Sequence, residues 1–247
     1  MAEYIKPRPE QLFVPARSMA ENACPAWEYH VHSTYSDGSA PLSELLHRAR
    51  LQGITRLIFT EHTETELTEA GEWFSRYWQE IEQLRSGERA ITILCGLEVP
   101  ITDYEGGLLL DAAMRAKVEF ILGAVHAYPG VRSLAGLGPD ALVEREFRGL
   151  MALAVNPLVD AIAHPGGTCQ RLGARLPLQR FAQVVQEATR HGTAIELNPA
   201  YHSPLLPYLE ICCQYDAWIS PGSNVHHPEE IGWAAHNLRK LQKKLQF

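Results

Sequence analysis

The chain has 247 residues, of which 46% are hydrophobic and 21% are charged, a composition typical of a globular protein. Its net charge of -7 gives no basic field that would recruit nucleic acid. No apolar run is long enough to cross a bilayer, and the first residues contain no apolar signal-peptide core. We therefore expect a cytoplasmic protein without a membrane or nucleic-acid partner.

The first segment of the chain lacks the regular pattern of apolar residues that the rest of the chain shows. Residues 1–26 are rich in proline and show no clear hydrophobic period, so we expect an N-terminal arm packed on the domain. Residues 27–247 are expected to form a single barrel domain. Within them, seven short runs of nearly continuous apolar residues predict strands buried on both faces. The runs are WEYHVH, RLIFTEH, AITILCGLEV, EFILGAVH, DAIAHP, AIELN and WISPGSNVH.

Amphipathic segments between these runs predict helices. They cover residues 41–52, 71–84, 106–116, 139–155, 177–191, 204–215 and 228–246. Proline near the start of several of them fits the first turn of a helix. Strands that alternate with helices indicate an α/β fold with a parallel sheet and right-handed crossovers. Seven similar units without a dinucleotide-binding fingerprint favour a closed, TIM-like barrel over an open sheet.

Side chains that can bind metal stand at the carboxyl end of every predicted strand. They are His30, His32, His62, Glu98, His126, His164, Glu196, Asn198, Asn224 and His226. In a parallel α/β barrel these ends meet on one face, where the loops build the active site. Asp37 follows the first pair in the stretch HVHSTYSDG. Histidines with only structural roles would not gather at the same end of successive strands, so the pattern predicts a metal centre there.

The number and type of donors suggest more than one ion. A single zinc uses three or four protein ligands, whereas enough donors converge here for two or three ions if one carboxylate bridges. Mixed imidazole and carboxylate donors suit Zn, Mn or Fe better than Ca or Mg. His202 lies just beyond the sixth strand. It can be a loop residue or a substrate contact.

The motifs also resemble a known family. In chain order, HVHSTYSDG, TEH, GLEV, GAVH, AHPGG and GSNVH resemble the motifs of the polymerase and histidinol phosphatase (PHP) superfamily of metal-dependent phosphoesterases, in a histidinol-phosphatase-like arrangement. The resemblance extends from about Trp27 to His226. It implies a distorted (β/α)7 barrel that holds up to three metal ions at the ends of its strands.

The resemblance also implies how the ligands are shared. The first donor set is His30, His32, Glu98 and the residue at position 224; the second is Glu98, His126 and His164; the third is Asp37, His62 and His226. Glu98 would bridge the first and second metals. Family members commonly have Asp where this chain has Asn224, whose amide oxygen carries no charge. This difference puts the affinity of the first metal in question.

These features predict a metal-dependent hydrolase that acts on a small phosphomonoester, such as histidinol phosphate or a sugar or nucleotide phosphate. The nucleophile would be a metal-bound hydroxide that bridges two ions. Glu98 would hold the ions close together, and Asp37 or His226 would position the leaving oxygen or carry a proton. Guanidinium groups match phosphate geometry, and the candidate substrate-binding residues are Arg132, Arg171, Arg175 and His202.

Three other interpretations of the function are consistent with the sequence. The substrate could be a phosphodiester or a cyclic phosphate. The chain could instead hydrolyse a C–N or C–O bond as amidohydrolase-type barrels do, although no lysine ends a predicted strand. It could also be a metal-binding homologue whose catalysis is reduced or lost because of Asn224. The sequence leaves a homo-oligomer open.

Overall fold

The computed structural model describes residues 4–22, 24–68, 71–134 and 136–245, and its described strands form one curled sheet. The strands are β1 (Val14–Pro15), β2 (Trp27–Glu28), β3 (Arg56–His62), β4 (Thr92–Pro100), β5 (Phe120–Ala124), β6 (Ala161–Ile162), β7 (Ala194–Glu196) and β8 (Trp218–Ser220). Their order in the sheet is β1-β8-β7-β6-β5-β4-β3-β2. Strands β2 to β8 are parallel and correspond to the seven predicted strands, whereas β1 was not predicted and pairs antiparallel with β8.

The two ends of the sheet approach each other beyond β2 and β8. The Tyr29 N–H donates to the Pro221 carbonyl at 2.9 Å, and the His32 N–H donates to the Val225 carbonyl at the same distance of 2.9 Å. The Val225 N–H returns a 2.9 Å bond to the His30 carbonyl. The α/β class is thus confirmed, but the curled sheet contains eight strands where the sequence predicted seven.

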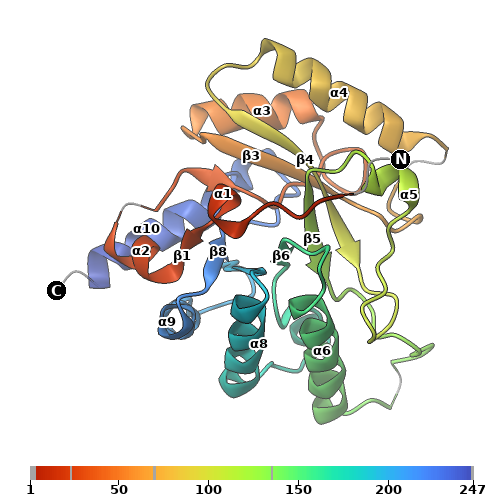
Figure 1. Cartoon of the computed structure of the whole chain (residues 1–247), viewed down its shortest axis with the longest axis vertical. Helices are drawn as coiled ribbons and strands as arrows, with labels where there is room; N and C mark the ends of the chain where they lie inside the picture. The colour runs from red at the N-terminus through yellow and green to blue at the C-terminus, as the bar shows by residue number, and fades with distance from the viewer. Residues whose placement is uncertain (1–3, 23, 69–70, 135, 246–247) are drawn as a thin grey trace.

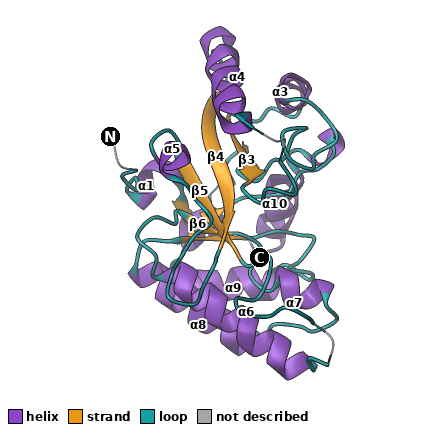
Figure 2. Cartoon of the chain, turned by 90° about the vertical axis from the view of Figure 1, so that its right-hand side faces the viewer, coloured by secondary structure: helices purple, strands orange, loops and turns teal. Residues whose placement is uncertain are grey.

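Helices cover the outer faces of the sheet. They are α1 (Pro9–Leu12), α2 (Ala16–Glu21), α3 (Leu42–Leu51), α4 (Trp73–Gly87), α5 (Ala112–Arg115), α6 (Pro139–Ala154), α7 (Gly167–Arg171), α8 (Leu178–Arg190), α9 (Leu206–Tyr215), the 3-10 turn η1 (Pro228–Glu230) and α10 (Trp233–Leu245). Helices α3 and α4 lie on one side of the strands, and α6, α8 and α9 lie on the other (Figures 1 and 2). None of the described helices combines the length and the apolar character that a membrane span requires.

Helix α8 illustrates why these segments are helical. It buries Phe181, Val184, Val185 and Ala188, which recur every three or four residues along one side of the helix. Gly192 follows its end with a φ of +64°, a left-handed conformation that glycine adopts without a steric penalty. The apolar side therefore packs on the sheet and the chain turns directly into β7.

Two predicted helices are shorter than expected. Within residues 106–116, only Ala112–Arg115 is helical, because the Asp103 carboxylate ties the preceding backbone into a turn by accepting bonds from the Glu105 and Gly107 N–H groups. Within residues 228–246, Gly232 at a φ of +83° separates η1 from α10. Residue 246 lies outside the described residues.

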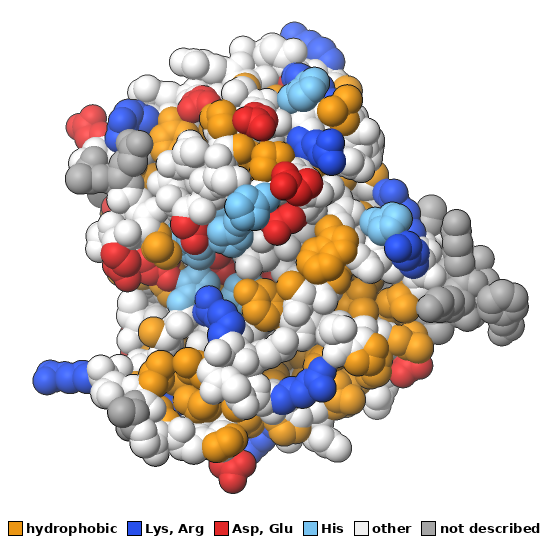
Figure 3. Space-filling view, turned by 180° about the vertical axis from the view of Figure 1, so that it is seen from behind, with side chains coloured by type: hydrophobic (Ala, Val, Ile, Leu, Met, Phe, Trp, Pro, Cys, Tyr) orange, Lys and Arg blue, Asp and Glu red, His pale blue; other side chains and the backbone are white. Residues whose placement is uncertain are grey.

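The N-terminal segment covers the amino ends of the strands. The Tyr29 hydroxyl and the Arg56 guanidinium both donate to the Leu12 carbonyl, at 2.7 Å and 3.3 Å. Leu12 and Phe13 pack in one buried cluster with Tyr29 and Phe120. Helix α1 lies at the front of the view in Figure 1, whereas the histidines appear in the view from behind in Figure 3. We keep, as a proposal, the division into an arm of residues 1–26 and one domain of residues 27–247.

Candidate metal centre

Alternation along the strands places the polar residues of the centre. Successive side chains of a strand point to opposite faces, so Ile58, Thr60 and His62 of β3 share one face. His62 lies directly opposite Glu98 in the register of β3 and β4. Two residues that are far apart in the sequence therefore become neighbours at the carboxyl end of the sheet, as the strand pattern predicted.

Glu98 lies at the middle of the cluster and is fully buried. Its Oε2 lies 3.2 Å from His30 Nε2, 3.2 Å from His62 Nδ1 and 3.4 Å from His32 Nε2. Its Oε1 lies 3.0 Å from the Nε2 atoms of His126 and His164. Burial would raise the pKa of this carboxyl, but the surrounding imidazoles, with His30 first, hold its pKa well below the ordinary value. The ionised carboxylate is thus the form that this site favours.

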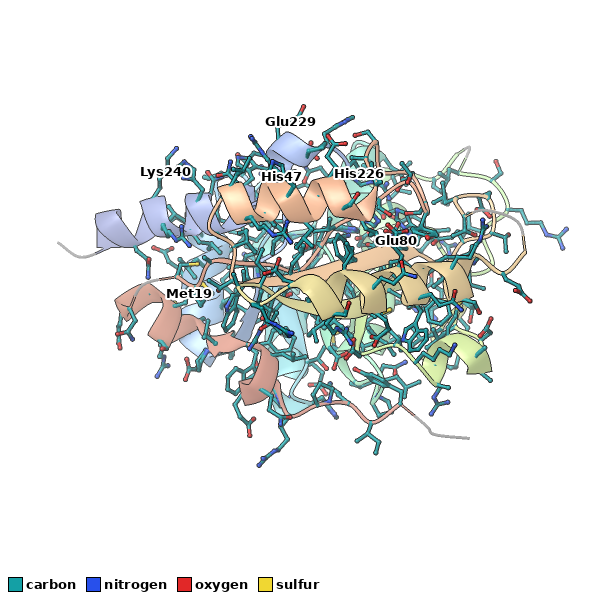
Figure 4. The ribbon with its side chains drawn as sticks, turned by 90° about the horizontal axis from the view of Figure 1, so that it is seen from above. Met19, His47, Glu80, His226, Glu229 and Lys240 are labelled. Atoms are coloured by element: carbon teal, nitrogen blue, oxygen red, sulfur yellow. The ribbon has the colours of Figure 1, made fainter. Side chains whose placement is uncertain are left out.

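A second carboxylate lies at the edge of the cluster. Asp37 Oδ1 is 3.4 Å from His62 Nε2, and Asp37 Oδ2 is 3.3 Å from His226 Nε2. Figure 4 labels His226, from the loop between β8 and η1, near one end of α3, and His47 on that helix. The structure therefore brings Asp37, His62 and His226 together, and His32 lies close enough to join them.

The arrangement fits metal ions. The histidine and carboxylate members of each donor set offer ligand atoms within 4.8 Å of one another, and so do His62, Glu64 and His126. Several buried polar atoms of the sets have no hydrogen-bond partner among the described residues: His30 Nε2, His32 Nδ1, His62 Nδ1 and Glu98 Oε2. Unpaired polar atoms are costly to bury, and divalent cations would satisfy them. The imidazole and carboxylate donors suit Zn, Mn or Fe.

Buried carboxylates hold the loops that carry these ligands. The Glu61 carboxylate accepts bonds from the Ser33 N–H at 3.0 Å and from the Ser33 and Ser36 hydroxyls at 2.7 Å and 2.5 Å. Gly38 lets the same loop fold back, because a Cβ there would lie 2.2 Å from the His32 carbonyl oxygen. The loop is thus fixed with Asp37 facing the histidines.

The loop after β8 is held in a similar way. The Glu28 carboxylate accepts bonds from the N–H groups of Ser223 at 2.8 Å and of Gly232 at 3.0 Å. Gly222 allows the loop to approach the centre, since a Cβ there would lie 2.0 Å from Glu196 Oε1. These contacts place residue 224 beside the first donor set.

Glu196 supports a ligand of the first set, a role that the sequence prediction did not assign to it. Its Oε1 lies 2.7 Å from His30 Nδ1, and its other oxygen accepts a bond from the His164 N–H. Burial opposes the charged form of His30, but Glu196 and Glu98 outweigh it and raise the pKa of His30 to about 10. The position of Glu196 at the end of a predicted strand was the sequence signal for a role at the centre. Its pairing with His30 could be recognised only from the fold.

Glu64 was missed by the sequence analysis. Its Oε1 bonds His126 Nδ1, and its Oε2 lies 3.7 Å from His62 Nδ1. The side chain is 12% exposed and lines the cavity of the centre. Glu64 follows His62 by two residues. A predicted strand extended by two residues would have placed both side chains on the same face of the sheet.

The centre opens into a cavity of about 610 Å³. Arg171 lines this cavity, and Arg132 lines an adjoining chamber. The structure does not bring Arg175 to either space, because its guanidinium donates to the Ser203 carbonyl at 2.6 Å and lies in a separate groove. His202 is buried, with one ring nitrogen 3.0 Å from the Pro165 carbonyl oxygen and the other accepting the Asn198 N–H, so its nitrogens are engaged by backbone.

Asn224 points at the first donor set. Its Oδ1 lies 3.1 Å from His32 Nε2, and its amide donates to the Tyr201 hydroxyl at 3.4 Å. The residue has a φ of +54°, a left-handed conformation that asparagine tolerates better than most residues. The backbone here therefore accommodates an amide, and the side chain occupies the position that the resemblance assigns to a ligand.

We expect Asn224→Asp to strengthen the first metal site. A carboxylate beside a divalent cation adds an attraction that an amide lacks, and the affinity should rise on the order of tenfold at a partly wet site. A chelator titration of zinc-loaded protein, followed by elemental analysis, measures the change. If the order of release and the stoichiometry stay the same, Asn224 is not a ligand position.

Comparisons with known proteins identify the family of this chain. The family model described as the PHP domain matches residues 28–200. A probable phosphatase of Caldicellulosiruptor saccharolyticus is 25% identical over 229 residues, which cover 89% of this chain and 87% of that protein. A phosphoribosyl 1,2-cyclic phosphate 1,2-diphosphodiesterase of Eggerthella lenta is 34% identical over 112 residues, or 44% of this chain and 35% of that protein.

A solved structure shares the fold. The crystal structure of histidinol phosphate phosphatase from Lactococcus lactis, complexed with zinc, L-histidinol and phosphate, aligns with a TM-score of 0.64. The alignment covers 90% of this chain and 94% of that one, at 17% sequence identity. The likeness therefore extends over nearly the whole of both chains.

Proposed function

The chain belongs to the PHP domain family of metal-dependent phosphoesterases, and we propose that it hydrolyses a small phosphomonoester at a centre of two to three divalent transition-metal ions. The phosphatase activity named for its relatives supports a hydrolase of phosphate esters. Histidinol phosphate, a sugar phosphate and a nucleotide phosphate are the candidate substrates, and zinc, manganese and iron are the candidate metals.

One observation carries the proposal. A fully buried carboxylate, Glu98, has both oxygens within 3.4 Å of imidazole nitrogens from five different histidines. A cluster of this kind is costly unless cations or protons neutralise it. Because Glu98 faces histidines of more than one donor set, it would serve two metal sites, which suits a reaction in which both the attacking and the leaving oxygen need stabilisation.

The residues around the centre have separate tasks. Bound metal ions would supply an activated water and would neutralise charge on the phosphoryl oxygens. Arg171, at the wall of the cavity, would bind a phosphoryl oxygen through its guanidinium. Asp37 or His226, which form a 3.3 Å pair at the cavity, would position the leaving oxygen or carry a proton.

A cyclic or diester phosphate is the second candidate. It is favoured by the similarity to the Eggerthella lenta diphosphodiesterase, although that match covers less than half of this chain. The same donor sets would serve both reactions, because each needs an activated water and a stabilised leaving oxygen. The two candidates differ in the substrate and not in the centre.

A substrate screen tests the proposal. Protein reconstituted with zinc, manganese or iron is assayed against a library of phosphate monoesters, diesters and cyclic phosphates, and chelated protein is the control. We expect turnover of at least one monoester that depends on the metal. Full metal loading without turnover of any ester would instead indicate a metal-binding homologue that has lost catalysis.

A further inference from the structure

A side chamber of about 390 Å³ opens beside the cavity of the metal centre. The two spaces share the lining residues His126, Ala127 and Arg171. In Figure 3 a central group of histidines lies in a hollow, with acidic side chains above and beside it and basic and hydrophobic side chains below. A substrate bound at the metal centre can therefore extend into this chamber.

The chamber differs in charge from the rest of the protein. The chain has 29 acidic and 22 basic residues, and the cavity of the metal centre is lined by Asp37, Glu64, Glu66 and Glu98. The residues that line the side chamber include two arginines and no carboxylate. The chamber thus offers positive charge inside an acidic protein, which indicates an anionic ligand.

Neither arginine of the chamber is neutralised by a carboxylate among the described residues. The Arg171 guanidinium donates to the Thr168 hydroxyl at 3.1 Å. Arg132 forms no hydrogen bond or salt bridge with the part of the chain that the structure describes. Val131, Leu134 and Leu172 supply apolar walls, of which Leu134 and Leu172 are 45% and 37% exposed.

The two arginines line different spaces. Arg171 lines both spaces, so it can reach the phosphoryl group at the metal centre. Arg132 lines only the side chamber. We infer that the substrate carries a second anionic group, a carboxylate or a second phosphate, that binds Arg132 in the chamber. This inference rests on the proposed function for the placement of the ester at the metal centre.

The binding of phosphonates, which cannot be hydrolysed, tests the inference without any need for turnover. Zinc-loaded protein is titrated calorimetrically with butylphosphonate, 4-phosphonobutanoate and 4-aminobutylphosphonate, which differ only in the terminal group. We expect 4-phosphonobutanoate to bind on the order of tenfold more tightly than butylphosphonate, whose terminal methyl group is uncharged, because its carboxylate adds one charge-assisted hydrogen bond. The ammonium compound should bind less tightly than the carboxylate.

Two variants locate the effect. Arg132→Met should remove the preference for the carboxylate and leave the affinity for butylphosphonate unchanged. Arg175→Met is the matched control, because this exposed arginine lines neither space, and it should keep the preference. Equal affinities for 4-phosphonobutanoate and butylphosphonate, or a preference for 4-phosphonobutanoate that survives Arg132→Met, would overturn the inference. Turnover of simple monoesters in the same preparation would then leave the proposed function standing.

Discussion

Replacing Glu98 by glutamine should lower the turnover of any phosphate ester by about a thousandfold, the upper range for loss of one charge-stabilising group. The amide has the shape of the carboxylate but not its charge, and five histidines face it within 3.4 Å. The two proposed metal sites that would share Glu98 would lose their common anion. We therefore expect at least one ion to leave, which elemental analysis of the purified variant measures.

The fold should survive this change, because the glutamine fills the same volume. Far-ultraviolet circular dichroism and the melting temperature of metal-depleted protein check that point. Glu66→Gln is the control, since Glu66 lines the same cavity but is exposed and contacts no histidine among the described residues. Parental turnover in Glu98→Gln would show that Glu98 does not bridge the metals.

The convergence of the histidines could be predicted because the carboxyl ends of parallel strands must lie at the same edge of the sheet. Each apolar run ends in a side chain that can bind metal, and parallel strands bring these ends to one edge. His62 and Glu98 are 36 positions apart by residue number (98 - 62), and the register of β3 and β4 makes them neighbours. The apolar runs predicted that these ends converge, whereas the pairing of His62 with Glu98 comes from the register of the structure.

Short elements and loops could not be predicted in the same way. Strand β1 has two residues, Val14 and Pro15, and no periodicity reveals a strand of that length. Its pairing with β8 depends on the arm that covers the amino ends of the strands. The loop that includes Leu108 and Leu109 has apolar residues like those of a helix, but the Asp103 turn determines its path.

Position near a strand end also does not fix the direction of a side chain. Arg171 and Arg175 are four residues apart after β6, and only Arg171 lines the cavity of the centre. His202 follows β7 but packs against Phe181 and Tyr208, with its ring nitrogens held by backbone. The direction of these three side chains is set by loop geometry that the sequence pattern does not encode.

Glu64 is the residue of the centre for which the structure adds most. One oxygen bonds the Nδ1 atom of His126, whose Nε2 lies 3.0 Å from Glu98, and the other lies 3.7 Å from the Nδ1 atom of His62. His126 belongs to the second donor set and His62 to the third. A carboxylate behind a ligating histidine fixes the orientation of the ring and raises its basicity. We therefore propose that Glu64 positions His126 by its hydrogen bond and places negative charge beside His62.

Glu64→Gln should weaken metal binding by roughly 10–100-fold, the usual cost of losing such a partner. The amide oxygen can still accept one hydrogen bond, but the negative charge is lost and an NH2 group now faces one of the two rings. Competition between zinc-loaded protein and a chromogenic chelator measures the affinities. Glu64→Asp keeps the charge at a shorter reach and should recover part of the loss, whereas Glu66→Gln should bind zinc as the parent does.

Two further measurements separate positioning from a general loss of structure. The melting temperature of metal-depleted Glu64→Gln should match that of the parent, because the fold does not depend on a side chain at the rim of the cavity. With excess zinc, kcat should recover while KM stays near the parental value, since Glu64 acts on the ligands of the metals. If zinc affinity is unchanged and only KM rises, Glu64 contacts the substrate instead, and the rings of His62 and His126 are held in place without it.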